Sequence, residues 1–311
     1  MSEPNSIDGI LVRWGDRLFY PGNRVVGSRS PRLRNPSTEQ RASALRQRIH
    51  ATVVRRAPQV MVKVTGGGRG MKAIAAHFRY ISKAGRLDIE DDQGEVSRGR
   101  GVLRELADEW RLGGALIDDT SLRREALNIM LSMPRGTDPL AVQRAAREFA
   151  RTEFADHKYV MVLHDHQGNP HVHLSVRVES KSSRRLNPRK ADLHRWREVF
   201  AEKLRDLGVE AEATRQATRG VARNYDPIWR LKARHAGRKV IQRPGIKEGS
   251  AALGSRQSAA QSWRHIASAL SGSALAGDRS LAVAINHHVS KVEPKLDRAG
   301  RVNVDRAARG R

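Results

Sequence analysis

Four of the chain's 12 histidines lie close together in the segment VLHDHQGNPHVHLSVRV, residues 162–178. His164 and His166 form one pair and His171 and His173 form the other, with a single residue between the members of each pair. The surrounding residues are largely apolar, which is typical of β-strands. Because side chains alternate between the two faces of a strand, the members of each pair share a face.

The residues QGNP at 167–170 predict a four-residue turn that joins the two strands. Such a turn would place His166 opposite His171 and His164 opposite His173, with cross-strand Cβ atoms about 4.5–5.5 Å apart. The four imidazoles would then meet at one end of a sheet.

Clustered imidazoles indicate a metal site, because neutral imidazole is the commonest nitrogen ligand for divalent ions. We expect three of the four imidazoles to close around one ion and to leave room for a substrate oxygen. Mg²⁺ or Mn²⁺ would suit phosphate chemistry, and Zn²⁺ or Co²⁺ would also suit a site of three nitrogens. The alternative is a group of surface histidines that binds no metal.

Tyr80 is the candidate nucleophile. In residues 71–83 the apolar side chains recur at i, i+4 and i+7, which predicts an amphipathic helix. Tyr80 lies roughly 100–140° from the apolar face of that helix, so its phenol need not be buried. His77 precedes it by one turn, and Arg79 and Lys83 are nearby cations that can bind phosphate.

A tyrosine beside a metal site suggests phosphoryl transfer through a covalent phosphotyrosine. The competing interpretation is an ordinary amphipathic tyrosine at the edge of a helix, and the helix alone favours it. Of the other tyrosines, Tyr159 begins a predicted strand, Tyr20 lies in a polar N-terminal region, and Tyr225 lies in the basic stretch RNYDPIWR.

The remaining patterns predict an α+β domain with a largely antiparallel sheet and helices on one side. The predicted strands span 59–65, 125–134, 159–166 and 171–178. The predicted helices span 71–83, 102–116, 138–154 and 191–208, with Asp138 as an N-cap. Two further helices are compatible with residues 261–271 and 279–290.

Charge divides the chain of 311 residues into three regions. Residues 58–213 carry a net charge of +4, whereas residues 1–57 carry +7 and residues 214–311 carry +14, which together make the chain's +25. We therefore expect a central globular domain between two basic extensions, the first largely flexible with one short helix and the second partly helical. Such basic flanks favour a polyanionic partner.

Several functional classes are excluded by composition. The chain has no cysteine, so it holds no disulfide, cysteine-rich zinc module or thiol nucleophile. No run of about 18 apolar residues predicts a membrane span, and the N-terminus lacks the order of a secretory signal. We expect a bacterial cytoplasmic protein.

Three segments resemble, in order, the three motifs of plasmid mobilisation and conjugative relaxases of the MobA/VirD type. They are FRYISKAGRL (78–87), NIMLSMPRGTDP (128–139) and HDHQGNPHVHLSV (164–176). The resemblance covers about residues 58–210. It implies a palm-like antiparallel sheet flanked by helices, the fold of the His-hydrophobe-His endonucleases.

This resemblance also implies an activity and a set of residue roles. Relaxases nick one DNA strand at an origin of transfer, and the motif tyrosine takes the 5′ phosphate and later rejoins the strand. By this likeness Tyr80 is the nucleophile, His171 and His173 bind the metal, and His164 is the third ligand or a base near the tyrosine. Ser132 matches a serine associated with DNA contact near the nick. Accessory roles are expected for Asp165, His166 and His77.

The sequence departs from the family pattern at two positions. His166 stands where the third motif usually has an aspartate, and Asp165 is its neighbour. Asn128 stands where the strand before Ser132 often begins with histidine. Neither change removes the nucleophile or the pair formed by His171 and His173.

The expected partners follow from the same resemblance. They are single-stranded DNA at an origin of transfer, relaxosome accessory proteins, and a coupling protein with its type IV secretion system. The enzyme would act as a monomer and could enter the recipient cell with the DNA. The residues expected to contact DNA are Arg79, Lys83, Arg177, Arg184, Arg185, Arg189 and Lys190.

Two other functions compete with this interpretation. A non-catalytic DNA-binding accessory protein would explain the basic flanks but not the histidines beside Tyr80. A rolling-circle replication initiator generally carries its tyrosine after the His-x-His motif, where Tyr225 is the only candidate. The order of the motifs therefore favours a relaxase.

Overall fold

The computed structural model describes residues 6–20, 36–166, 168–221, 223, 226, 228–241, 245–247 and 249–292. Two compact units are formed by the described residues. Residues 57–213 make up the first, which we call the sheet unit. Described residues from both ends of the chain, up to residue 56 and from residue 214 onward, make up the second, the helical unit.

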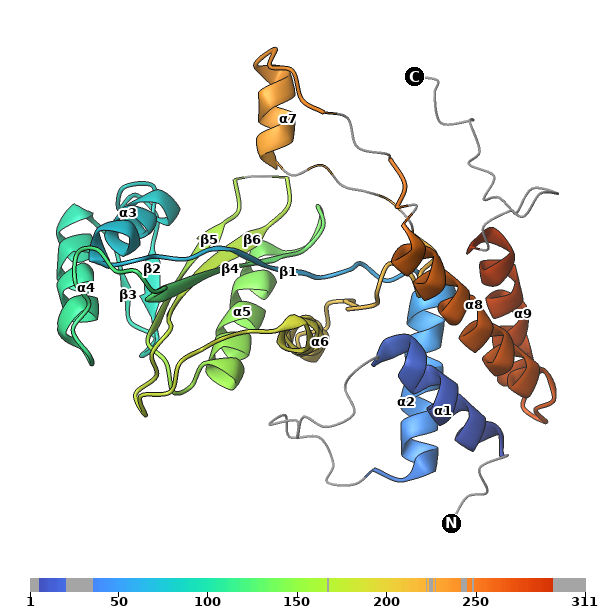
Figure 1. Cartoon of the computed structure of the whole chain (residues 1–311). Helices are drawn as coiled ribbons and strands as arrows, with labels where there is room; N and C mark the ends of the chain where they lie inside the picture. The colour runs from blue at the N-terminus through green and yellow to red at the C-terminus, as the bar shows by residue number, and fades with distance from the viewer. Residues whose placement is uncertain are drawn as a thin grey trace. The chain divides into compact units, whose positions relative to one another are not determined.

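A six-stranded antiparallel sheet with the order β1-β4-β6-β5-β2-β3 forms the centre of the sheet unit (Figure 1). Its strands are β1 (Met61–Gly66), β2 (Ile89–Asp91), β3 (Val96–Ser97), β4 (Ala126–Ser132), β5 (Tyr159–His164) and β6 (His171–Arg177). Its helices are α3 (Met71–Ile81), α4 (Arg100–Leu112), α5 (Pro139–Glu153) and α6 (Lys190–Asp206). The expected α+β class and antiparallel sheet are confirmed.

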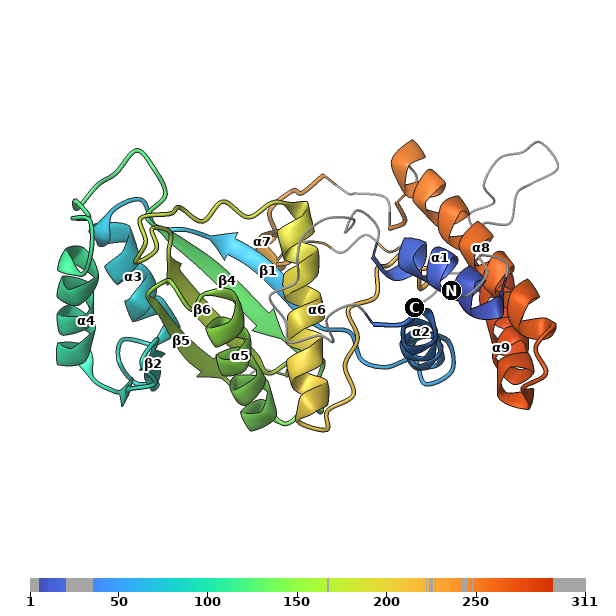
Figure 2. The same cartoon turned by 90° about the horizontal axis from the view of Figure 1, so that it is seen from below.

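Helices cover both faces of the sheet, so the expectation of helices on one side is wrong. Alternate strand residues such as Leu131, Val172 and Leu174 pack with Phe149 of α5 and Trp196 of α6 in one apolar core. Figure 2 shows α5 and α6 lying across this face. The opposite face, which we call the site face, packs against α3 and α4 along β5, and a second apolar cluster fills that contact. The periodicity of each helix was visible in the sequence, but not the face of the sheet that it covers.

The helical unit contains α1 (Ile7–Phe19), α2 (Thr38–Val53), α7 (Ile228–His235), α8 (Ser250–Ser271) and α9 (Ala276–Val292). Four of them, α1, α2, α8 and α9, share one apolar core that includes the fully buried Trp263. The one short helix expected in residues 1–57 corresponds to α2, whereas α1 was not expected. Their apolar residues are buried by α8 and α9 from the other end of the chain, which sequence patterns along one segment do not show.

Two short strands, β2 and β3, were not predicted, because runs of three and two residues carry no clear alternation. Asp138 caps α5 as expected, and its carboxylate accepts hydrogen bonds from the backbone N–H groups of Leu140 and Ala141. No helix among the described residues is long and apolar enough to cross a membrane.

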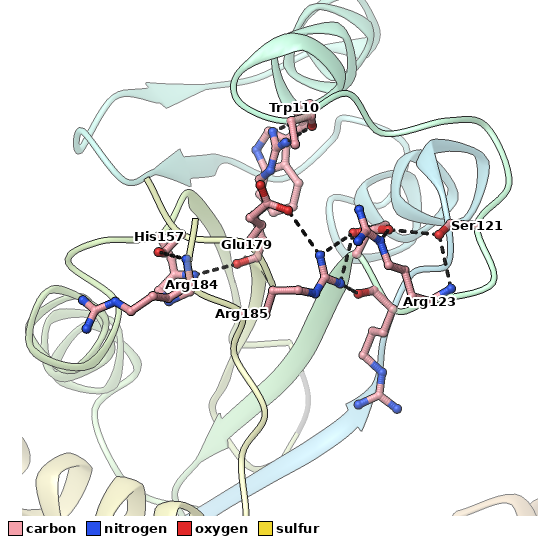
Figure 3. Close-up of polar contacts among 12 residues, drawn as sticks. Trp110, Ser121, Arg123, His157, Glu179, Arg184 and Arg185 are labelled. Atoms are coloured by element: carbon pink, nitrogen blue, oxygen red, sulfur yellow. Dashed lines mark hydrogen bonds and ion pairs between the residues drawn. The ribbon is translucent and has the colours of Figure 1, made fainter. Parts of the chain in front are cut away.

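Arg177, at the end of β6, has a structural role. It is only 3% exposed, and its guanidinium donates to the carbonyl oxygens of Trp110, Gly113 and Ala115, where α4 ends. The Nδ1 of His157 lies 2.9 Å from the Arg177 carbonyl oxygen. Figure 3 shows this end of the sheet, where Arg185 is paired with acidic groups that include Glu179. Arg177 thus donates hydrogen bonds to carbonyl oxygens at the end of α4, where the helix itself provides no N–H donor.

Replacing Arg177 by leucine is expected to lower the free energy of unfolding by about 2–4 kcal/mol, because three carbonyl oxygens lose their donor in a buried place. The matched control is Arg184→Leu, since Arg184 is largely exposed with one weak ion pair, and a change of less than about 0.5 kcal/mol is expected there. Urea denaturation followed by circular dichroism measures both. Equal losses of unfolding free energy in the two variants would contradict the structural role of Arg177.

Candidate metal centre and nucleophile

Three histidines meet on the site face where β5 ends and β6 begins. His164 lies directly opposite His171, and His173 lies opposite Val162. The predicted pairing of His166 with His171 and of His164 with His173 is therefore wrong by two residues. A shift of two keeps every side chain on its face, so the imidazoles still converge.

The shift arises because the connection between β5 and β6 spans residues 165–170 instead of four residues. Pro170 has no N–H to give to a longer ladder with β5. Its carbonyl oxygen instead accepts hydrogen bonds from the Met133 N–H, at 3.1 Å, and from the Ser132 hydroxyl, at 3.2 Å. The start of β6 is thus anchored to β4, and His166 is left exposed in the connection.

The imidazoles of His164, His171 and His173 are buried and could hold a metal ion. One ring nitrogen from each lies within 4.8 Å of the others. Their ring centroids are separated by 5.1 Å between His164 and His171, 4.6 Å between His164 and His173, and 5.2 Å between His171 and His173. Three converging imidazoles are a common donor set for a divalent ion.

Backbone carbonyls orient two of the three rings. The Nε2 of His164 lies 2.6 Å from the Ile81 carbonyl oxygen, and the Nδ1 of His171 lies 2.9 Å from the Asn169 carbonyl oxygen. A carbonyl can only accept, so these nitrogens carry the hydrogens and the opposite nitrogen of each ring keeps a free lone pair. The Nδ1 of His173 is buried with no hydrogen-bond partner, which a bound cation could supply. The donor set therefore fits a divalent metal.

Burial favours the neutral form of His173 and His164. The pKa of His173 is lowered to about 3, mainly by burial and in addition by the neighbouring imidazoles of His164, His171 and His77. Burial also lowers the pKa of His164, although the hydrogen bond to Ile81 opposes this effect. Neutral imidazoles at neutral pH are the form that ligates metal.

Tyr80 lies beside this cluster with its side chain largely in solvent. The amphipathic helix was predicted correctly, since Ile74, Phe78 and Ile81 of α3 are fully buried while Tyr80 is 69% exposed. The Tyr80 ring centroid lies 6.2 Å from that of His173. An exposed phenol next to three buried imidazoles can reach a phosphate that also touches a bound metal.

The other described tyrosines lack this arrangement. Tyr159 is buried under the sheet, and burial raises its pKa to about 12. Tyr20 belongs to the helical unit, where the guanidinium of Arg48 lies over its ring. Tyr225 lies outside the described residues.

Comparison with known proteins agrees with this geometry. Residues 80–209 match the family model "Relaxase: MobA/VirD2-like, nuclease domain". The chain contains a MobA/VirD2-like relaxase nuclease domain. The match begins at Tyr80 and includes all three clustered histidines.

Three curated relatives carry the name T-DNA border endonuclease VirD2. The protein from Rhizobium radiobacter is 27% identical over 207 residues, which cover 60% of this chain and 48% of the relative. The protein from Agrobacterium fabrum (strain C58 / ATCC 33970) is 25% identical over 185 residues, covering 52% and 41%, respectively. The protein from Rhizobium rhizogenes is 24% identical over 133 residues, covering 38% and 30%. The matches thus span less than half the length of each relative.

Within the relaxase domain, the ring of His77 lies near those of Tyr80 and His173. Its ring centroid lies 6.2 Å from that of Tyr80 and 6.4 Å from that of His173. Its Nε2 is buried without a hydrogen-bond partner, and burial lowers its pKa. Of the predicted accessory residues, His77 is the one whose ring lies close to both Tyr80 and His173.

The chain turns sharply after α3, the helix that carries Tyr80. Lys83, Ala84 and Gly85 have φ values of 51°, 60° and 82°, a left-handed run that is uncommon for residues other than glycine. The buried Ser82 hydroxyl holds the turn, because it donates to the Phe78 carbonyl at 2.7 Å and accepts from the Gly85 N–H at 3.0 Å. Lys83 is close enough for its charge to lower the pKa of His164. Such strained backbone is often found at functional sites.

Ser132, Asp165 and His166 differ in how closely they approach the cluster. Ser132 is buried on β4 directly opposite His171, so its side chain lies on the same face of the sheet as the cluster. His166 is exposed, with its ring centroid 5.2 Å from that of His164. Asp165 is exposed in the same connection. The buried group of three contains His164 and not His166.

Most of the cations predicted to contact DNA lie away from the relaxase site. Arg79 is exposed on α3 beside Tyr80, and Lys83 follows the same helix. Arg177 is buried with its guanidinium occupied, as described above, and it lies six residues along β6 from His171, roughly 20 Å away. The structure therefore contradicts its prediction as a DNA contact.

Arg184 and Arg185 follow β6 at that distant end, where they pair with acidic residues that include Asp156 and Glu125. Arg189 and Lys190 begin α6, which covers the opposite face of the sheet, and the Asp192 carboxylate accepts from the Arg189 N–H at 2.8 Å. These four residues are therefore not placed to contact a strand at the histidine cluster. The sequence predicted them from charge alone, and charge does not reveal the end or face of a sheet on which a side chain lies.

Removing His173 is expected to weaken Mn²⁺ binding by about 10-fold or more, because a buried ligand with no other hydrogen-bond partner at Nδ1 is lost. The matched control is His166→Ala, which removes an exposed imidazole outside the buried group and is expected to leave the affinity within about twofold. Isothermal titration calorimetry with Mn²⁺ measures both variants without any DNA present. An equal loss in both variants, or no loss in His173→Ala, would contradict the proposed ligand set.

Proposed function

We propose that this chain is a relaxase that nicks one DNA strand at an origin of transfer and later rejoins it, with Tyr80 as its nucleophile. The observation that carries the proposal is the exposed Tyr80 phenol beside the ring of the buried His173, within a relaxase nuclease domain. The three relatives named as T-DNA border endonucleases support DNA strand cleavage as the activity.

In the proposed reaction the Tyr80 oxygen attacks the scissile phosphorus. A bond forms between that oxygen and phosphorus, the bond from phosphorus to the 3′ oxygen breaks, and the 3′ oxygen leaves with a proton as a free hydroxyl. The phenol proton passes to a nearby base, for which His77 is the candidate, or to water, because the Ile81 carbonyl and the proposed ion use both nitrogens of His164. The covalent phosphotyrosine conserves the energy of the phosphodiester, so the reverse reaction needs no nucleotide cofactor.

We propose that His164, His171 and His173 hold a divalent metal, with Mg²⁺ or Mn²⁺ preferred and Zn²⁺ or Co²⁺ as alternatives. When bound, such an ion neutralises negative charge on a phosphate and helps to orient it. The chain's own residues do the rest. Ile81 and Asn169 fix the orientation of two rings through their carbonyls, and burial favours the neutral form of His173.

Cations near the tyrosine would hold the scissile strand. Arg79 and Lys83 lie before and after Tyr80, one exposed and the other half-buried at the strained turn. We propose that they bind phosphates next to the nick, and that Ser132 helps to position the strand from the row of His171. His166 and Asp165 would act at the rim of the site.

The proposed setting is plasmid mobilisation or conjugation in a bacterial cytoplasm. The substrate would be single-stranded DNA at the origin of transfer, opened by relaxosome accessory proteins. A coupling protein and a type IV secretion system would then deliver the nicked strand, with the enzyme attached to it, to the recipient. The catalytic unit would act as a monomer, since Tyr80 and the three histidines come from one chain.

Replacing Tyr80 by phenylalanine is expected to reduce covalent protein–DNA adduct by at least about 10³-fold, because the attacking oxygen is lost. The assay incubates the protein and Mn²⁺ with single-stranded oligonucleotides that tile the replicon encoding it, followed by denaturing gel electrophoresis. EDTA is expected to abolish the adduct of the unmodified protein.

The matched control is Tyr20→Phe, because Tyr20 lies in the helical unit away from the histidines of the sheet unit. It is expected to form as much adduct as the unmodified protein. Undiminished adduct in Tyr80→Phe would refute the assignment of the nucleophile. Absence of adduct from the unmodified protein on every oligonucleotide would refute the proposed activity.

A further inference from the structure

One part of the site face carries no helix among the described residues of the sheet unit. On this face α3 and α4 pack over β5, whereas the side chains of β1 are exposed and Met130 of β4 is half-buried. Met61 is 42% exposed and Lys63 is also exposed, although both belong to a sheet strand. On the other face of β1, Val62 is fully buried in the main core.

The pairing of β1 with β4, and of β4 with β6, places these exposed residues opposite the histidine cluster. Met61 lies opposite Ser132, which lies opposite His171. One row further along, Lys63 lies opposite Met130, which lies opposite His173. Directly opposed residues share a face, so Met61, Lys63 and Met130 point to the same side as the three histidines. We call these three residues the β1–β4 surface.

The distance between Lys63 and His173 is short enough for one DNA strand to contact both. Two strand spacings of about 4.8 Å separate Lys63 from His173 at the backbone, which gives roughly 10 Å. That distance equals about three nucleotides of stacked strand at about 3.4 Å each. A strand whose scissile phosphate lies at the histidines can therefore reach Lys63 within a few nucleotides.

The chemistry of the β1–β4 surface also suits single-stranded DNA. Among the described residues no acidic group forms an ion pair with Lys63, so its ammonium is free to bind phosphate. Met61 and Met130 provide polarizable, apolar contact for bases, since Met130 is half-buried and Met61 exposed. Proteins that bind single strands combine cations for the backbone with apolar platforms for the bases.

We propose that the β1–β4 surface binds the single-stranded DNA next to the scissile phosphate, with Lys63 contacting a backbone phosphate and Met61 and Met130 contacting bases. This inference deepens the proposed function and rests on it for the position of the scissile phosphate. It also explains why most of the cations expected from the sequence are absent from the site. The strand crosses from β6 to the edge strand β1 and does not follow β6 toward Arg177.

A salt titration tests the contact of Lys63. Binding of a fluorescent oligo(dT) 20-mer is followed by anisotropy in EDTA, so that no chemistry takes place. The slope of log affinity against log salt is expected to fall in magnitude by about 0.7 in Lys63→Gln, the value for one phosphate contact on a single strand. The matched control is Arg144→Gln, which removes one exposed positive charge from α5 on the opposite face and is expected to leave the slope unchanged.

Crosslinking tests the position of the strand directly. The chain has no cysteine, so a single Met61→Cys substitution can carry a benzophenone maleimide without competing sites. The matched control is Leu140→Cys, because Leu140 is an apolar residue of α5 that is 59% exposed on the opposite face. Under ultraviolet light the labelled Met61→Cys protein is expected to capture the oligo(dT) at least fivefold more than the control.

The outcomes separate this inference from the proposed function. Equal salt slopes in Lys63→Gln and the unmodified protein, or equal crosslinking at positions 61 and 140, would overturn the inference even if Tyr80 forms its adduct. The expected slope and crosslinks without any Tyr80 adduct would uphold the surface and overturn the proposed cleavage. Circular dichroism spectra that match the unmodified protein establish that each variant is folded.

Discussion

The hydrogen bond between the His164 imidazole and the Ile81 carbonyl connects the two halves of the proposed site. His164 ends β5, and Ile81 is the last residue of the helix that carries Tyr80. The bond uses one nitrogen of His164 and leaves the other facing the histidine cluster, so the same contact sets the tautomer and the position of the tyrosine helix. Burial of Ile74, Phe78 and Ile81 holds α3 against the sheet and keeps this bond out of water.

The rest of the domain positions this contact. Pro170 and its bonds to β4 set the start of β6, which brings His171 opposite His164 and Ser132 opposite His171. At the other end of β6, Arg177 joins the strand to the end of α4, and α4 packs against α3 through the contact of Trp110 with Phe78. In our proposal, the DNA strand reaches Tyr80 across the β1–β4 surface. Cleavage of a strand at one fixed phosphate requires a rigid sheet, a helix held against it, and an uncovered surface.

Sequence alone predicted the local features of this arrangement well. Alternation predicted that the histidines share a face, and helical spacing predicted that Tyr80 lies outside the buried stripe of α3. It failed where the answer depends on long-range packing. The register of the hairpin was wrong because the anchoring partner of Pro170 is β4, a strand almost 40 residues away in the chain. Arg177 was misread because its carbonyl partners come from the end of α4.

Lys63 was overlooked for the same reason. Its place in the row of His173 depends on the order of β1, β4 and β6, which no local pattern reveals. Helix α1 was missed because its apolar residues are covered by α8 and α9, more than 200 residues later. The three motif segments, in contrast, do lie close together, since Ser132 is opposite His171 and the ring of Tyr80 is near that of His173.

Mass spectrometry of the trypsin-digested protein–DNA adduct tests the central claim most directly. Cleavage after Arg79 and Lys83 would release Tyr80 in the tetrapeptide YISK, separate from every other tyrosine. We expect the nucleotide to be attached to this peptide through a phosphotyrosine. Attachment to the peptide that contains Tyr225, or to any residue other than Tyr80, would contradict it.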